Sequence, residues 1–264
     1  MSIEPHMQPS GVDFAAMYDG HGEYAARRVA GSFEQEQVLL ETTGFKIPNL
    51  MSLLPPGLLL RSVLEIGCAT GELIANFPVA PGGRRVGCDI SVANVAAASA
   101  RYPETAFLAG DFADLSLDAF DVVVLSDVLE HVEDDSEFLR RAARLGRHVL
   151  VNLPLEDNWL NRNRRYGPED ASGHLRFYTE QEGLNLFARA GLGVRNQRRV
   201  WIHELEVDTR RREMRRQHFG QGYSGALATR AAKAAALGMA RAVRPLGRWL
   251  FASNLFALAD GKAS

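Results

Sequence analysis

The chain has 264 residues, 46% of them hydrophobic, which suits one α/β domain with accessory helices and leaves room for two small domains. Thirty lysines and arginines against 32 aspartates and glutamates give a net charge of −2, which provides no overall attraction for nucleic acid or an anionic membrane. No apolar run reaches the roughly 20 residues of a membrane-spanning helix, and the N-terminal residues do not read as a signal peptide. With Cys68 and Cys88 predicted to be a reduced pair, we expect a cytoplasmic protein.

Residues 1–54 are predicted to form an N-terminal helical cap. Residues 1–12 are polar and contain prolines, so we expect them to be loose. From Val12 onward apolar residues recur at helix-like intervals, and the sequence LPPG at 54–57 ends the pattern. Residues 55–264 then form the second, larger unit.

A strand, a glycine-bracketed turn and a helix start are predicted from the sequence VLEIGCATGELIANF at 63–77. Gly67 and Gly71 remove the Cβ atoms that would block a ligand, and the first N–H groups of the helix lack partners within it. This turn therefore predicts a binding site.

The details of the turn separate two classes of ligand. A dinucleotide fingerprint needs glycines where Ala69 and Glu72 stand, and a carboxylate at the head of the helix repels a pyrophosphate. Glu65, two residues before the first glycine, favours a cationic ligand instead, because it can pair with an ammonium group.

Four more strands are predicted, at 85–90, 106–109, 120–126 and 147–153, with helices of about 91–101 and 134–145 among the connections. Asp89 follows Gly67 by 22 residues, the place where a second parallel strand offers a carboxylate to ribose hydroxyls. Asp111 follows the third strand and is a further candidate for the binding site, although it could instead cap a turn. Gly67, Asp89, Asp111 and Ser126 are all expected at one edge, because the carboxyl ends of parallel strands meet there.

A long polar loop at 154–173 follows the fifth strand, and loops of this length commonly gate a site, so we predict a lid. After it, Thr179 and Glu182 form a capping box for the next helix. A sixth strand is predicted at about 193–207 and a last one at 253–259. The predicted fold is therefore α/β: a Rossmann-like, seven-stranded, mostly parallel sheet with its last strand antiparallel and helices on both faces.

The segment at about 208–250 is predicted to be a helical insertion before the last strand. Five basic residues lie between Ala226 and Ala259. On a helix they would fall within an arc of about 80°, which suits peripheral contact with a membrane. These residues are Arg230, Lys233, Arg241, Arg244 and Arg248. We favour the alternative that Pro245 breaks this helix before the final strand, and that the arginines at 209–217 form a solvated helix face.

Taken together, the string E-x-G-x-x-x-G and the acids after the strands resemble class I S-adenosylmethionine-dependent methyltransferases. The string GHLRFYT at 173–179 looks like a bacterial branch that tailors saccharides, lipids or natural products. The resemblance implies that S-adenosylmethionine is the cofactor, S-adenosylhomocysteine the product, and a small molecule or saccharide the acceptor. It assigns the methionine end to Glu65, Gly67, Cys68 and Gly71, the ribose to Asp89, the adenine to Ile90, Asp111 and Phe112, the floor under the sulfonium to Ser126, and lids to Tyr18 and Tyr24.

Methyl transfer from a sulfonium needs alignment and exclusion of water, with a base only where the acceptor must lose a proton. His131 and His174 are the candidate bases, and the alternative for each is a structural hydrogen bond. The string Asp127-x-x-Glu130-His131 resembles the ExxEH metal motif of some O-methyltransferases, with Asp in place of the first Glu. Acids are also common at helix starts and the sequence identifies no further ligand, so no metal is predicted.

Two other functions stay open: a non-catalytic module that binds S-adenosylmethionine or S-adenosylhomocysteine, and an NAD-dependent oxidoreductase. A nucleic-acid acceptor is disfavoured, because SDVL stands after the fourth strand in place of an Asn-Pro-Pro-Tyr tetrad. A homodimer also stays open.

Overall fold

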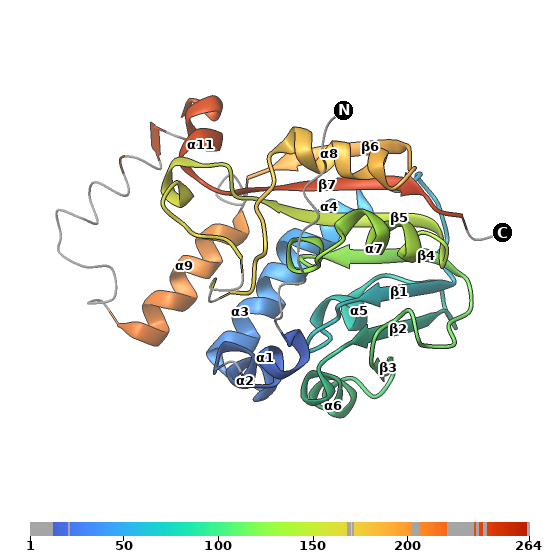
Figure 1. Cartoon of the computed structure of the whole chain (residues 1–264). Coiled ribbons are helices and arrows are strands. Elements are labelled where there is room, and N and C mark those ends of the chain that lie inside the picture. The colour runs from blue at the N-terminus through green and yellow to red at the C-terminus, as the bar shows by residue number, and fades with distance from the viewer. Residues whose placement is uncertain are drawn as a thin grey trace.

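The computed structural model describes residues 13–20, 22–167, 170, 172–201, 206–220, 235, 238–239 and 242–262. Its centre is a seven-stranded sheet of order β3-β2-β1-β4-β5-β7-β6 (Figure 1). The strands are β1 (Ser62–Ile66), β2 (Arg84–Asp89), β3 (Ala106–Ala109), β4 (Phe120–Ser126), β5 (Gly146–Leu155), β6 (Val194–Val200) and β7 (Ser253–Asp260). β1 to β5 pair in parallel, and β7 lies antiparallel between β5 and β6, so the predicted fold class is confirmed.

Helices cover both faces of the sheet. The N-terminal ones are α1 (Phe14–Gly20), α2 (Gly22–Arg28), α3 (Phe33–Glu41), the π-helical turn η1 (Thr42–Lys46) and α4 (Ile47–Met51). The others are α5 (Glu72–Asn76), α6 (Val92–Arg101), the 3-10 turn η2 (Leu129–His131), α7 (Asp135–Ala142), the 3-10 turn η3 (Trp159–Asn161), α8 (Glu180–Arg189), α9 (Glu206–Phe219) and α11 (Arg244–Leu250). α1, α2 and α3 lie at the carboxyl end of the parallel strands (Figure 1).

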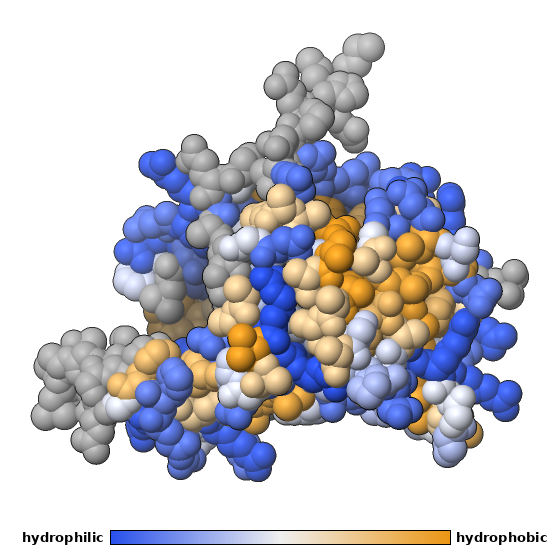
Figure 2. Space-filling view, turned by 90° about the horizontal axis from the view of Figure 1, so that it is seen from below, coloured by the Kyte–Doolittle hydropathy of each residue, from blue (hydrophilic) through white to orange (hydrophobic). Residues whose placement is uncertain are grey.

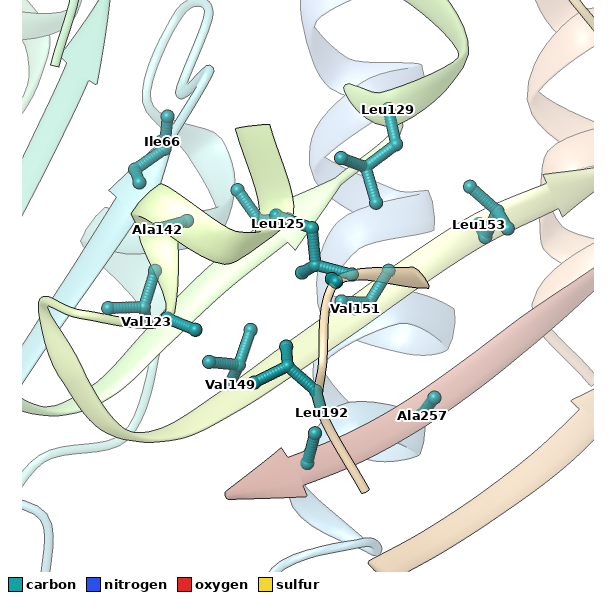
Figure 3. Close-up of a cluster of buried hydrophobic side chains, with 14 of the residues drawn as sticks. Ile66, Val123, Leu125, Leu129, Ala142, Val149, Val151, Leu153, Leu192 and Ala257 are labelled. Carbon is teal, nitrogen blue, oxygen red and sulfur yellow. The ribbon is translucent and has the colours of Figure 1, made fainter. Parts of the chain in front are cut away.

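The core divides into two layers because side chains alternate along each strand. In β4, Val123 and Leu125 pack with Leu139 of α7 and Leu186 of α8, the layer drawn in part in Figure 3. Val122 and Val124 point to the other layer, where η1, α4 and α5 supply most of the helical side chains. Outside the core, the face seen from below carries interspersed apolar and hydrophilic side chains (Figure 2).

Apart from β6, the strands after the glycine turn follow the predicted boundaries closely, with β3 and β4 exact, and the capping box of Thr179 and Glu182 is present at α8. The predicted helix at 134–145 is shorter, since α7 ends at Ala142 and Gly146 already belongs to β5. Within the cap, the helical run is broken between α2 and α3, where Ser32 begins a new helix by accepting from the N–H of Gln35.

The predicted sixth strand is wrong at its end. β6 stops at Val200, which pairs with Asn254 of β7, and Val207 lies in helix α9 instead. Glu206 and Asp208 stand in the first turn of α9, where carboxylates are stabilised by the helix dipole. A strand needs a partner, and the pattern of apolar residues does not show where the partner ends.

The tail differs from the prediction at Pro245, which stands in the first turn of α11, where its missing N–H costs nothing. The final strand is confirmed as β7. Arg230, Lys233 and Arg241 of the basic stripe lie outside the described residues. The arginines of α9 are only partly solvated, since Arg211 pairs with Glu41 of α3 at 3.3 Å. No helix in the described part of the chain has the length and apolar character to cross a bilayer.

Candidate functional site

A cavity of about 490 Å³ lies at the carboxyl ends of β1, β2 and β4, under α1 to α3 and η1. The structure brings nearly all predicted cofactor residues to its wall. They are Tyr18, Tyr24, Glu65, Gly67, Cys68, Asp89, Ile90, Asp111, Phe112 and Ser126, joined by the predicted catalytic His131. Gly71 stands behind the wall, where a Cβ would lie 2.7 Å from the ring of Phe107.

The glycine turn is held by the neighbouring strand. The N–H groups of Gly67 and Cys68 both donate to the carbonyl oxygen of Cys88, at 2.8 and 3.0 Å. Gly67 has a φ of +77°, and a Cβ on it would lie 2.5 Å from a methyl carbon of Val128. Glycine is therefore required here both by the backbone conformation and by the space.

Asp89 bridges two segments of the site. Its carboxylate accepts from the N–H of Ala69 at 2.8 Å and from the N–H of Ser91 at 2.9 Å. Each carboxylate oxygen has a second lone pair, so the group retains acceptor capacity toward the cavity. Burial raises the pKa of Asp89, and the two backbone hydrogen bonds oppose that rise.

Glu65 is buried in the wall with 3% of its surface exposed, and it accepts from the N–H of Ile74 at 3.0 Å. Burial raises the pKa of Glu65 to about 8, even though Lys46 and the backbone hydrogen bond favour the ionised form. A cation entering the cavity would shift this carboxyl toward its ionised state.

An ion pair that the sequence did not reveal lies beneath the site. The Nζ of Lys46, from η1, lies 2.7 Å from Oδ2 of Asp127, whose φ is +55°. Burial lowers the pKa of Lys46, but the carboxylates of Asp127 and Glu41 together outweigh it and leave the pKa above its ordinary value. The side-chain amide of Asn152 donates to Asp127 at 3.2 Å and to the hydroxyl of Ser126 at 3.0 Å.

Two of the residues predicted to bind adenine, Asp111 and Phe112, also have structural roles. Asp111 lines the cavity, but its carboxylate also accepts from the N–H of Ala113 at 2.9 Å, the turn-capping role left open by the sequence. Phe112 packs edge-on against Phe138 in the core, with 4.9 Å between ring centroids, so it is both a core and a wall residue.

A second cavity of about 270 Å³ adjoins the first, and Tyr24, Arg27, Lys46, Asp127 and His131 line both. His174 and Glu130 line only the second cavity, so the two predicted catalytic histidines meet there. Their rings are perpendicular, with centroids 4.7 Å apart.

Each histidine has one ring nitrogen engaged. The Nδ1 of His131 lies 3.0 Å from the carbonyl oxygen of Gly173, and the Nδ1 of His174 lies 2.8 Å from Oε2 of Glu156. Burial, with His174 nearby, lowers the pKa of His131 to about 4. Glu156 was not predicted: it stands among other polar residues in the segment at 154–173, and only the fold brings it to His174.

A family model described as a methyltransferase domain matches residues 37–197, more than half of the chain. The chain belongs to this methyltransferase family. The predicted membership of a methyltransferase family is thereby confirmed, while the bacterial tailoring branch is not specified by the match.

Similar proteins agree with this placement. A Mycolicibacterium smegmatis protein named "Probable S-adenosylmethionine-dependent methyltransferase" is 38% identical over 36% of this chain and 38% of its own length. A ubiquinone biosynthesis O-methyltransferase of Rhodopseudomonas palustris is 33% identical over 37% of this chain and 41% of its own length. The chain thus spans about two fifths of the length of these curated relatives.

Solved structures share the fold at low identity. Magnesium protoporphyrin IX methyltransferase from Synechocystis PCC 6803, with bound SAM, matches with a TM-score of 0.54 and 14% identity over 98% of this chain and 100% of that one. Phosphoethanolamine N-methyltransferase 2 from Haemonchus contortus matches with a TM-score of 0.58 and 14% identity over 96% of this chain and 61% of that one.

The steric demand at Gly67 is testable against a matched glycine. Gly82 also has a left-handed φ, +74°, but nothing lies within 4 Å of a Cβ built there. We expect Gly82→Ala to lower the free energy of unfolding by about 1–2 kcal/mol, the cost of the left-handed backbone alone. Gly67→Ala should cost roughly 1–3 kcal/mol more, because the added methyl group meets Val128. Denaturant unfolding of both variants measures the difference, and equal costs would contradict the account of the turn.

Proposed function

We propose that the chain transfers the methyl group of S-adenosylmethionine to an oxygen or nitrogen atom of a small molecule, a saccharide or a lipid-linked metabolite. The observation that carries this proposal is the pair of adjoining cavities. The larger has the acids and the glycine turn that suit the cofactor, and the smaller holds the two histidines. His131 lines both, so an acceptor in the smaller cavity would face the cofactor beside it.

We assign the cofactor contacts as the sequence predicts them. Glu65 would pair with the ammonium of the methionine end, where Gly67, Cys68 and Gly71 form the cradle, and Asp89 would accept from the ribose hydroxyls. Ile90, Asp111 and Phe112 would hold the adenine, Ser126 would lie beneath the sulfonium, and Tyr18 and Tyr24 of the N-terminal helices would cover the site. The fit rests on two observations: a buried carboxyl with a raised pKa at Glu65, and a turn whose Gly67 leaves no room for a Cβ.

The acceptor side supplies the proton chemistry. A carbonyl oxygen only accepts, so the Nδ1 of His131 carries the proton in its contact with Gly173, and the neutral ring keeps a lone pair on Nε2. The acceptor atom's lone pair forms the new bond to the methyl carbon as the carbon–sulfur bond breaks with its electron pair staying on sulfur. We propose that His131 and His174 act on the proton that the acceptor loses.

The remaining proposals concern surroundings and organisation. A cytoplasmic location is supported by Cys68 and Cys88, which are free and buried. The division into a cap at 1–54 and a core at 55–264, the lid at 154–173 and the insertion at 208–250 stay predictions. So do membrane contact by the basic stripe, a homodimer and the absence of a nucleic-acid acceptor.

Cofactor binding separates this function from its rivals. Titration calorimetry should show that the protein binds S-adenosylmethionine and S-adenosylhomocysteine, with no comparable binding of NAD. Asp89→Ala should weaken binding of S-adenosylhomocysteine by roughly 10- to 100-fold, because hydrogen bonds to a charged group are each worth about 1.5–3 kcal/mol.

The matched control is Asp118→Ala, since Asp118 pairs with Arg84 at the surface and is not among the residues that line either cavity. This variant should bind like the wild type. No binding of either sulfur ligand to the wild type would overturn the proposed function, and NAD binding in their place would favour an oxidoreductase.

Binding should also release a proton from Glu65. With a pKa of about 8, this carboxyl is mostly protonated at pH 7 in the free protein, and pairing with the ligand's cationic end ionises it. The affinity should therefore rise with pH up to about 8 and level off above it.

At pH 7 the binding enthalpy should vary with the ionisation enthalpy of the buffer, corresponding to release of close to one proton. In Glu65→Gln this variation should disappear, because no carboxyl remains to ionise. Identical proton release by the wild type and by Glu65→Gln would refute the role of this residue.

A further inference from the structure

We propose that Glu130, His131 and His174 together bind a divalent transition-metal ion, such as Zn²⁺, in the second cavity. One ligand atom from each residue lies within 4.8 Å of the other two. Two of the residues come from η2, directly after β4, and His174 follows the segment at 154–173. The proposal rests on the proposed function, and with the ion bound the two histidines would act on the acceptor's proton through the ion and not as bases themselves.

The carboxylate of Glu130 is the first reason. It has 1% of its surface exposed, and among the described residues neither of its oxygens has a hydrogen-bond partner. Nε2 of His131 lies 3.8 Å from Oε1, beyond hydrogen-bond distance. A buried carboxylate without a partner costs several kcal/mol, and a protonated carboxyl would still leave its O–H unmatched. A metal ion would satisfy both oxygens' need for positive charge.

The outer contacts of the histidines are the second reason. Glu156 accepts from Nδ1 of His174, and the guanidinium of Arg164 forms an ion pair with Glu156 and lies 2.8 Å from Asp170. In the same way, the carbonyl oxygen of Gly173 accepts from Nδ1 of His131. Metal-binding histidines almost always donate their second ring N–H in this way, which fixes the tautomer and leaves Nε2 free to bind the ion.

The ligand set differs from the motif that the sequence contains. Asp127, the first acid of Asp127-x-x-Glu130-His131, is turned to Lys46 and Asn152 and does not belong to the cluster. The third ligand is His174, 43 residues after His131, which sequence spacing did not reveal. Two imidazoles and one carboxylate suit Zn²⁺ and its neighbours in the transition series better than Mg²⁺ or Ca²⁺, which prefer oxygen ligands.

The position of the cluster indicates what a bound ion would do. His131 lines both cavities, so an ion held there would lie where the acceptor meets the cofactor. Such an ion would lower the pKa of an acceptor hydroxyl, so that the oxygen loses its proton to solvent before the methyl group arrives.

The test is direct metal binding by the full chain, without a tag, after treatment with a chelator. Calorimetric titration with Zn²⁺ should show one tight site per chain, and Co²⁺ should give visible absorption bands that Zn²⁺ abolishes. Glu130→Gln keeps the size of the side chain and His174→Ala removes a ligand, and each should weaken binding at least tenfold. Glu156→Gln should weaken it about tenfold through the loss of the outer contact.

The matched control is His148→Ala, because His148 lies at the start of β5 beside Asp260 and outside both cavities. It should bind the metal like the wild type. Absence of a one-to-one Zn²⁺ or Co²⁺ site in the wild type, or metal binding by Glu130→Gln and His174→Ala as tight as that of the wild type, would overturn the proposal.

Binding of S-adenosylhomocysteine is measured in the same samples, so the two proposals fail separately. Retained cofactor binding in a variant that has lost the metal also shows that the variant is folded. Metal binding by a wild-type chain that binds no S-adenosylhomocysteine would sink the proposed function and leave the metal site standing.

Discussion

Burying carboxylates at one edge of a sheet costs free energy, and this constraint governs the arrangement of the whole site. Glu65, Asp89 and Glu130 are each at most 8% exposed. Asp89 is stabilised by two backbone N–H groups and Glu65 by one, while Lys46 is paired with Asp127. The buried carboxyls in the cavities therefore favour a positively charged ligand nearby. A sulfonium cofactor with an ammonium group would provide that charge in the larger cavity, and a metal ion would provide it in the smaller one.

The fold brings these acids together and stabilises the edge of the sheet at which they lie. β1, β2 and β4 pair in parallel, so their carboxyl ends deliver Gly67, Asp89 and Asp127 to the same edge. Apolar layers on both faces of the sheet hold that edge rigid, with strand residues such as Val123 and Val124 fully buried. The N-terminal helices cover this edge of the sheet and contribute Lys46, so the N-terminal helices form part of the cavity wall.

The strands and the acids that follow them could be read from the sequence because both are local signals. An apolar run ending in Gly67 or Asp89 is visible without knowing what packs beside it. Lys46, Asn152 and Glu156 could not be found in this way, since each gains its role from a partner more than ten residues away. The end of β6 was missed for the same reason: it depends on where β7 stops pairing, and not on the residues of β6 themselves.

The central claim is that the cofactor and the acceptor meet at His131, between the two cavities. A crystal structure of the chain with bound S-adenosylhomocysteine tests this most directly. We expect the ribose hydroxyls to lie against Asp89, the methionine end beside Glu65, and the sulfur to face the second cavity. A ligand bound elsewhere, or one whose sulfur is separated from His131 and His174 by intervening protein, would contradict it.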